Sequence, residues 1–193
     1  MPNWCECELY VKGERKEIQQ FLEKAKGENG ILDFNSFIPY PEEWRKLDKA
    51  YWGNMEKITC LRRKLKETKN AREKQKIQKQ IEKISKEMPE KDGFNQGGYE
   101  WCITNWGSKW NARHLDYYSP NPEELKDNLI LVRFDTAWSP PIPVVKKMSE
   151  MFPQLEFTLK YFECGMGFHG IFKASKGEVI ADKCVEYFGD RGG

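Results

Sequence analysis

The sequence contains few of the side chains and motifs with which proteins hold metals and cofactors. It has only two histidines, and its six cysteines include no C-x₂-C pair, the spacing typical of a zinc site. A P-loop for nucleotides and the H-x-E signature of zinc deaminases are also missing. We therefore expect no metal and no cofactor, and we favour a protein that is not an enzyme.

Long apolar runs are missing too. No segment approaches the ~18 consecutive apolar residues that a membrane-spanning helix needs. The start of the chain, MPNWCECELYV, lacks the basic region and the apolar run of a secretory signal. These patterns predict a cytoplasmic protein whose cysteines stay reduced.

Charge is plentiful but unevenly distributed, although the net charge is only +2. Residues 45–91 contain 16 Lys and Arg against 7 Asp and Glu, so this segment carries +9 and the rest of the chain −7. Within it, residues 57–86 hold 12 basic and 3 acidic side chains. Such a segment is typical of a surface that contacts phosphates or an acidic partner, and a solvated arm is the alternative.

The aliphatic side chains of this basic segment fall into two sets, each with helical spacing but out of phase with the other. The sets are Ile58, Leu61 and Leu65, and then Ile77, Ile81, Ile84 and Met88. Between them, Asn70 followed by Glu73 matches a helix N-cap and its capping box. The pattern predicts a helical hairpin within residues 54–88, with one long helix as the alternative.

The remaining segments read alternately as strands and helices. Strand patterns cover residues 4–13, a stretch near 109–118, residues 128–136 and 155–163, and FHGIFKA at 168–174. Helical patterns cover residues 14–26 and a segment that starts at Ser139, a good N-cap in front of two prolines. Strand, helix, strand, strand, helix, strand is the order of a ferredoxin-like fold.

We therefore predict an α+β protein with a ferredoxin-like antiparallel sheet, two helices on one face and an extra C-terminal strand. Residues 1–44 and 96–193 are assigned to this domain. Residues 45–95 are assigned to an inserted basic helical hairpin and its linker.

Five stretches, in this order, resemble a known family. They are MPNWCE at the start, DFNSFIPYPEEW at 33–44, NWGSKWNA at 105–112, FDTAWSPPIPV at 134–144 and KYFECGMGFHG at 160–170. Together they are similar to the YubB-like, ferredoxin-like domain family of phages and plasmids, everywhere except residues 45–95. The resemblance implies this fold and a protein made by a mobile element inside a bacterial host cell, but no particular activity.

Three of the seven tryptophans lie in the segment WCITNWGSKW at 101–110. In one interpretation Asn105, Trp106 and Trp110, beside Lys109, form a platform that stacks a base or lines a small-ligand pocket. In the other, which we favour, the indoles pack under the sheet and the segment is a corner of the core.

Other candidate sites carry less weight. A helix that begins after Asp135 could bind a phosphate at its N-terminus. However, prolines remove free N–H groups there and the carboxylate would repel an anion, so a packed helix start is favoured. Cys102 or Cys164 could pair with His114 or His169 as a nucleophile and base, but no nucleophile motif surrounds them. Buried thiols are the favoured interpretation.

The leading hypothesis is a non-enzymatic phage or plasmid protein that binds a host protein or ribonucleoprotein complex. Its purpose would be to inhibit a bacterial defence complex that targets nucleic acids. The expected binding residues are Arg62, Arg63, Lys64, Lys66, Lys74, Lys76 and Lys79, together with Asn105, Trp106, Lys109 and Trp110. Direct DNA or RNA binding by the hairpin is the first alternative, and a small enzyme with a pocket near Trp106 is the second. No membrane contact is expected, and the oligomeric state is left open.

Overall fold

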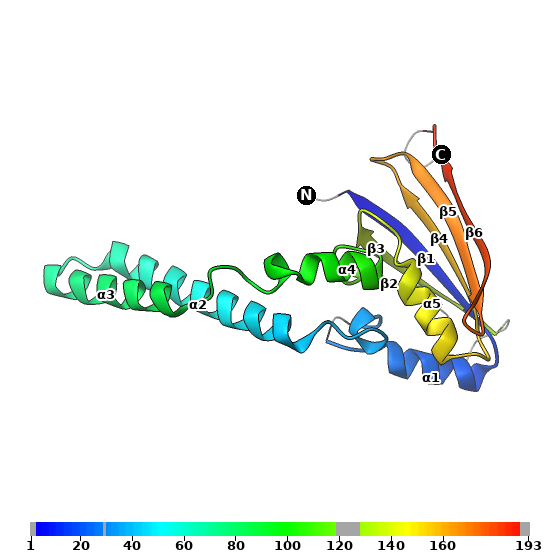
Figure 1. Ribbon diagram of the computed structural model, residues 1–193, viewed down its shortest axis with the longest axis horizontal. Helices are drawn as coiled ribbons and strands as arrows, with labels where there is room; N and C mark the ends of the chain where they lie inside the picture. The colour runs from blue at the N-terminus through cyan, green and yellow to red at the C-terminus, as the bar shows by residue number, and fades with distance from the viewer. Residues whose placement is uncertain (1–2, 29, 119–127, 190–193) are drawn as a thin grey trace. The chain divides into compact units, whose positions relative to one another are not determined.

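The computed structural model describes residues 3–28, 30–118 and 128–189 of the chain (Figure 1). Contacts within the chain separate two compact units. The first unit comprises residues 1–39 and 101–193, and the second comprises residues 40–100, which include the predicted insertion.

The first unit is built on a six-stranded antiparallel sheet. Its strands are β1 (Trp4–Lys12), β2 (Arg113–Tyr118), β3 (Leu129–Ala137), β4 (Glu156–Glu163), β5 (Phe168–Ser175) and β6 (Glu178–Glu186). They lie in the order β2-β3-β1-β4-β5-β6, and all neighbouring pairs are antiparallel. The part β2-β3-β1-β4, with one helix after β1 and another after β3, is the ferredoxin-like arrangement. The predicted α+β fold is confirmed.

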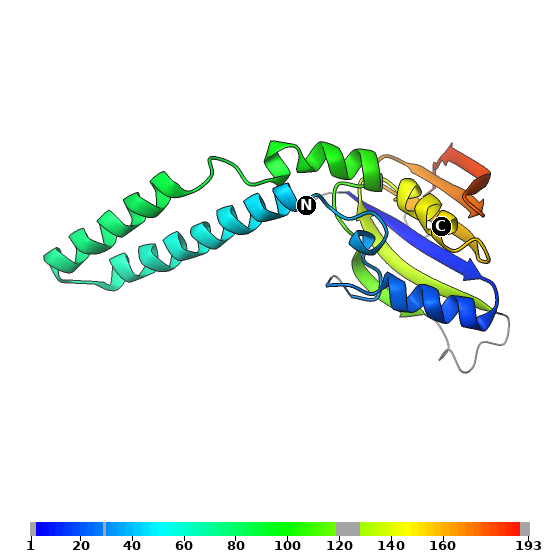
Figure 2. The ribbon, with the colours of Figure 1, turned by 60° about the horizontal axis from the view of Figure 1, so that its bottom comes forward.

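One face of this sheet is covered by two helices, α1 (Arg15–Ala25) and α5 (Ile142–Met151) (Figures 1 and 2). Alternate strand residues such as Leu9, Phe134 and Leu159 point to this side and are almost fully buried. Phe21 of α1 meets Phe157 of β4 edge to face, with ring centroids 5.4 Å apart. The apolar residues at alternate positions of β1, β3 and β4 therefore form a core on one face of the sheet only. The residues between them point to the other face.

The sheet has one strand more than the sequence predicted. β5 is the expected extra strand, and β6 returns beside it through Lys176 and Gly177, whose φ angles are +54° and +76°. Two positive φ angles are what a tight hairpin turn requires. Every side chain of β6 is exposed or half-buried. No apolar alternation therefore marked this strand in the sequence.

Most of the tryptophan-rich segment is helical, and no helix was predicted there. Helix α4 spans Gly98–Trp106 and follows a short 3₁₀ turn, η2 (Phe94–Gln96). Gly98 and the aromatic residues are poor helix formers, so the local sequence did not predict a helix. Cys102 and Trp106, one turn apart, are both buried, and their packing outweighs that propensity.

The start of α5 also differs from the prediction. The helix begins at Ile142 after Pro141, with no side-chain cap. Ser139 is not its N-cap, because the Ser139 hydroxyl donates to the Gly107 carbonyl at 2.6 Å. The two prolines and Ser139 instead close the loop against Gly107, where a β-carbon would crowd Pro143.

The second unit is a helical hairpin of α2 (Glu42–Glu67) and α3 (Ala71–Glu87). The Asn70 side chain accepts hydrogen bonds from the Arg72 and Glu73 amides at 2.9 and 3.3 Å, so the predicted cap is confirmed. The two predicted aliphatic sets face each other around a small core. The buried members are Ile58, Ile77 and Ile81, flanked by Leu61, Leu65, Ile84 and Met88. The chain thus forms two helices rather than one long one, and α2 starts earlier than predicted, at Glu42.

Candidate functional site

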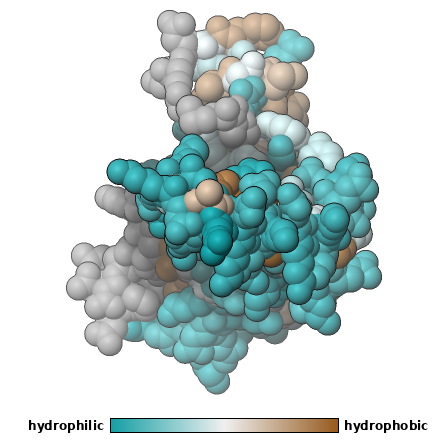
Figure 3. Space-filling model, turned by 90° about the vertical axis from the view of Figure 1, so that its left-hand side faces the viewer, coloured by the Kyte–Doolittle hydropathy of each residue, from teal (hydrophilic) through white to brown (hydrophobic). Residues whose placement is uncertain are grey.

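The outer surface of the hairpin carries the predicted basic side chains. Arg62, Arg63, Lys64 and Lys66 of α2 and Lys74, Lys76 and Lys79 of α3 are all exposed. In the part of the chain that the structure describes, none of the seven forms an ion pair. The hairpin surface that faces the viewer in Figure 3 is mostly hydrophilic. Because the hairpin's aliphatic side chains are used in its own core, this surface offers mainly positive charge.

Trp106 is part of the core and does not form an exposed stacking surface. Only 5% of its surface is accessible, and its indole N–H donates to the Ile38 carbonyl at 2.8 Å. Its ring lies edge to face against Trp101 and Phe34, with centroids 5.4 and 5.9 Å away. The Asn105 side chain donates back to the Trp101 carbonyl one turn earlier. For these two residues the platform interpretation does not fit, and the corner interpretation does.

Lys109 and Trp110 lie in a different setting, among partly exposed aromatic rings. The Lys109 ammonium lies 4.9 Å from the centre of the Trp110 ring and 4.5 Å from that of Trp138. Trp110 also contacts Trp4, with centroids 6.0 Å apart. A cation between two indoles is an attractive arrangement that holds the loop together. Of the four residues predicted for the platform, Trp106 is therefore buried, while Asn105, Lys109 and Trp110 are half-buried.

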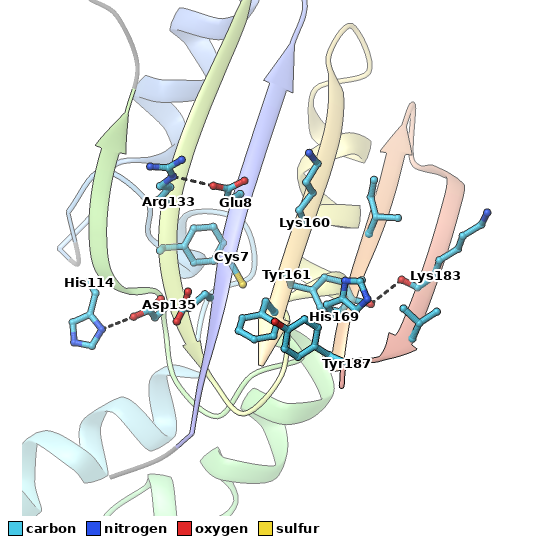
Figure 4. Close-up of a pocket in the computed structure, with 16 residues that line it drawn as sticks. Cys7, Glu8, His114, Arg133, Asp135, Lys160, Tyr161, His169, Lys183 and Tyr187 are labelled. Carbon is cyan, nitrogen blue, oxygen red and sulfur yellow. Dashed lines mark hydrogen bonds and ion pairs between the residues drawn. The ribbon is translucent and has the colours of Figure 1, made fainter. Parts of the chain in front are cut away.

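A larger hollow, of about 1040 Å³, lies on the sheet face opposite α1 and α5 (Figure 4). Residues of all six strands line it, with His114 as the contribution of β2, and Tyr187 lies beyond the end of β6. Trp106 is not among its lining residues. The outward side chains of β1, β3 and β4 form its floor, and β5 and β6 form one side.

Near β1 and β3 the hollow contains acidic groups that already have partners. Glu8 accepts from the Arg133 side chain at 3.0 Å and from the Tyr10 hydroxyl at 2.7 Å. This hydrogen bond to Glu8, and to a lesser extent burial, raises the pKa of Tyr10. The proton therefore stays on Tyr10, and the carboxylate of Glu8 is occupied on both oxygens.

His114 forms a second pair on the same face. Its Nδ1 lies 2.8 Å from Oδ2 of Asp135, and its ring meets Trp4 edge to face at 4.8 Å. His114 has a φ of +48°, in the left-handed region that non-glycine residues adopt infrequently. The strand pairing is also irregular between Arg113 and Asp116. This bulge turns the imidazole towards Asp135.

The half of the hollow over β4, β5 and β6 has a different chemistry, with lysines and aromatic rings. Register places Lys160, Ile171 and Lys183 in one row across the three strands, and Phe162, His169 and Val185 in the next. Tyr187 follows β6 and contacts the Phe162 and His169 rings, at 4.7 and 5.8 Å. Within these three strands neither row contains an acidic side chain, although on β1 Glu8 lies opposite Lys160 and Glu6 lies opposite Phe162.

Sequence reasoning missed this face because its residues come from six separate strands. Its polar side chains lie at outward positions of those strands, where a polar side chain normally means only contact with water. The available signal was the run of charged or aromatic residues at alternate positions, such as Glu6, Glu8 and Tyr10 in β1. The alternation within one strand indicates which of its residues face outward, but it does not indicate which strands lie side by side. These residues could therefore not be grouped without the strand order.

The remaining candidates are not brought together. Cys102 is buried in α4, Cys164 is exposed after β4, and the six cysteines form no disulfide. Burial raises the pKa of the Cys7 thiol well above its usual value, which keeps it protonated. Among the described residues, no group of three or more His, Cys, Asp and Glu could hold a metal ion. No helix in those residues is long and apolar enough to span a membrane.

The segment Gly165–Gly170, GMGFHG, has the glycine spacing of a dinucleotide-binding loop. Here it joins the antiparallel strands β4 and β5, and no helix follows it. The buried Glu163 carboxylate accepts from the Gly165 and Met166 amides at 2.8 and 2.5 Å. These amides are therefore occupied by the protein's own carboxylate, and the turn does not match a phosphate-binding loop.

Comparison with known proteins gives a fold but no activity. Residues 105–190 match the model of a family described as a ferredoxin-like domain in Api92-like protein. The crystal structure of a protein api92 from Yersinia pseudotuberculosis is similar, with a TM-score of 0.51 and 11% sequence identity over 98% of this chain and 99% of that chain. Among curated proteins, none matches the chain. The YubB-like resemblance and the mobile-element origin stay predictions. The part of the chain from β2 to the end of β6 is thus similar to the ferredoxin-like domain of Api92-like proteins.

Proposed function

We propose that the protein is a non-enzymatic binding protein whose basic hairpin attaches to a host protein or ribonucleoprotein complex. The observation that carries this proposal is the hairpin surface. Seven basic side chains are exposed on two adjacent helices, and none has an ion-pair partner among the described residues. A partner with a negatively charged surface would pair with those of them that face it.

The energetics of the hairpin favour a charged partner over a purely structural arm. Like charges three and four residues apart on a helix are destabilising, by a few tenths of a kcal/mol for each pair. Residues 57–86 carry 12 basic against 3 acidic side chains, so few of these repulsions can be offset internally. Binding to phosphates or carboxylates removes the repulsion and releases counterions. The contact is therefore expected to be strong at low salt and weak at high salt.

The cellular role that we propose is inhibition of a bacterial defence complex that targets nucleic acids. It is supported by the resemblance of the sequence to a family of phages and plasmids, since mobile elements must evade such defences. The basic hairpin would bind an acidic surface of that complex, or the phosphates of the nucleic acid that the complex holds. The half-exposed Lys109 and Trp110 would supply an additional anchor.

The test compares two variants that each lose three positive charges. In the hairpin variant Arg62, Arg63 and Lys66 are replaced by Gln, which keeps helix propensity. In the control, the exposed Lys16 and Lys24 of α1 and Lys146 of α5 are replaced by Gln. We expect the immobilised hairpin variant to capture at least about tenfold less partner from bacterial lysate, while the control captures as much as the unchanged chain. Equal capture by the two variants would show that the hairpin does not carry the binding.

Direct nucleic-acid binding is the second candidate, and the same exposed cations favour it. It predicts that the purified protein binds a fluorescent 20-base-pair duplex without any partner. The logarithm of the association constant should then fall linearly with the logarithm of salt concentration, with a slope of roughly −0.9 for each phosphate contacted. The hairpin variant should show a shallower slope. Failure of the duplex to bind at low salt would remove this candidate.

A further inference from the structure

We propose that the open sheet face over β4, β5 and β6 binds a short segment of single-stranded nucleic acid. Aromatic rings would stack its bases, and lysines would contact its phosphates. This site lies within the first unit, is separate from the hairpin surface, and does not depend on the hairpin's proposed role.

The first observation is the separation of charge on this face. Two of the three acidic groups on β1 and β3 have polar partners on that side, because Glu8 forms an ion pair with Arg133 and Asp135 lies 2.8 Å from Nδ1 of His114; the third, Glu6, lies opposite Phe162 of β4. On the other side, Lys160 and Lys183 form no ion pair within the described part of the chain, and the Lys160 ammonium lies 5.0 Å from the centre of the Tyr10 ring. An anion is therefore attracted to the β4–β6 half and has little reason to settle on the β1–β3 half.

The second observation is the arrangement of the rings. Phe162 and Tyr187 meet at an interplanar angle of 78°, and the His169 and Tyr187 rings meet at 71°. Each ring is thus held in orientation by its neighbours before a ligand arrives, which lowers the entropy lost on binding. Phe162 and Tyr187 are half-buried, while His169 is exposed. Flat faces of this kind accept any base, whatever the sequence.

The third observation is the spacing of the two rows, which the strand register sets. Lys160 is two residues from Phe162 along β4, and Lys183 is two residues from Val185 along β6. Two residues of a strand span about 7 Å, so the lysine row runs beside the aromatic row at roughly that separation. A nucleotide presents its base and its phosphate side by side, joined through the sugar, and so matches the two parallel rows.

An acidic peptide is the competing occupant, because lysines attract carboxylates as well. The rings decide against it, since a glutamate side chain offers them no flat surface to stack on. The hollow of about 1040 Å³ also exceeds what two lysines need to hold carboxylates, and leaves room for bases above the rings.

The test measures the anisotropy of fluorescent ten-residue oligomers of uridine and of deoxythymidine. Both are titrated with the chain that carries the Arg62, Arg63 and Lys66 to Gln changes, so that hairpin binding does not mask the sheet site. We expect K183E to weaken binding about tenfold and Y187L to weaken it by a similar factor. The control K146E makes the same charge change on α5, on the opposite face, and should change binding less than twofold.

The arms of the test separate the outcomes. Tighter binding of the uridine oligomer would identify RNA, and equal binding would identify single strands in general; both support the site. Equal effects of K183E and K146E, no loss in Y187L, or equally effective competition by polyglutamate would each overturn it. Circular dichroism of every variant shows whether the fold is kept. Because K183E alters an exposed side chain, its result stands even if Y187L unfolds.

Discussion

Trp106 is a single side chain that joins α4 to the segment around Phe34 and Ile38. Its indole N–H is bound to a backbone carbonyl, that of Ile38, and its ring fills the space between Phe34 and Trp101. A buried ring of this size contributes several kcal/mol through removal of apolar surface from water. The role of Trp106 is therefore packing, and the binding surfaces lie elsewhere.

Replacing Trp106 by Ala should lower the free energy of unfolding by roughly 3–5 kcal/mol, because it leaves a cavity in the core. Trp106→Phe should cost less but still about 1–3 kcal/mol, because the Ile38 carbonyl loses its donor. Urea unfolding followed by circular dichroism measures both. If Trp106→Ala has unaltered stability, the residue is not a core side chain.

Tyr161 gives a prediction about pH at the residue scale. Burial, followed by a hydrogen bond to Cys184, raises its pKa above the usual value of 10.0, and its ring lies over Gly170. A proton held more tightly in the folded state contributes stability that is fully present below pH 10 and is lost as the pH rises above it, since the unfolded chain ionises first.

We therefore expect the free energy of unfolding to decline as the pH rises above about 10, and to decline less steeply in Tyr161→Phe, which has no proton to lose. Urea unfolding at several values between pH 8 and 11.5 measures the two slopes. Tyr10, whose pKa is also raised, contributes a further part that remains in the variant. Identical slopes in the two proteins would contradict the assignment.

At the scale of elements, the Asn70 cap sets the boundary between α2 and α3. Its side chain satisfies two amides at the start of α3. Asn70→Ala should destabilise α3 by about 1 kcal/mol, whereas Asn70→Asp, which can accept the same hydrogen bonds, should change it little. Amide hydrogen exchange of residues 71–87 reports the difference. Equal exchange in both variants would show that the cap does not hold the hairpin.

The elements differ in how well the sequence predicts them, and burial explains the difference. β1, β3 and β4 each bury one face, so their apolar alternation was visible, and the two aliphatic sets of the hairpin were visible for the same reason. β6 buries neither face, and α4 is built from residues with poor helix propensity. β6 depends on pairing with β5, which directly precedes it, and α4 depends on packing against residues distant in sequence, such as Phe34 and Ile38.

At the scale of the whole molecule, the chain carries two separate surfaces that suit anions. The hairpin surface was predicted, because its cations are contiguous in sequence. The open sheet face was not, because Lys160, His169 and Lys183 come together only through the order of β4, β5 and β6. A count of charge along the chain does not reveal this face either. The acidic side chains of Glu8 and Asp135 enter that count, and their partners come from other strands.

In our proposal, the protein works by holding a macromolecule of its host. The most direct test is affinity capture from bacterial lysate on the immobilised full chain, with and without nuclease. We expect a stoichiometric protein partner that survives nuclease and is released by moderate salt. Nucleic acid alone, lost on nuclease treatment, would instead indicate direct binding by the hairpin. An eluate without any enriched host macromolecule under both conditions would contradict the proposal.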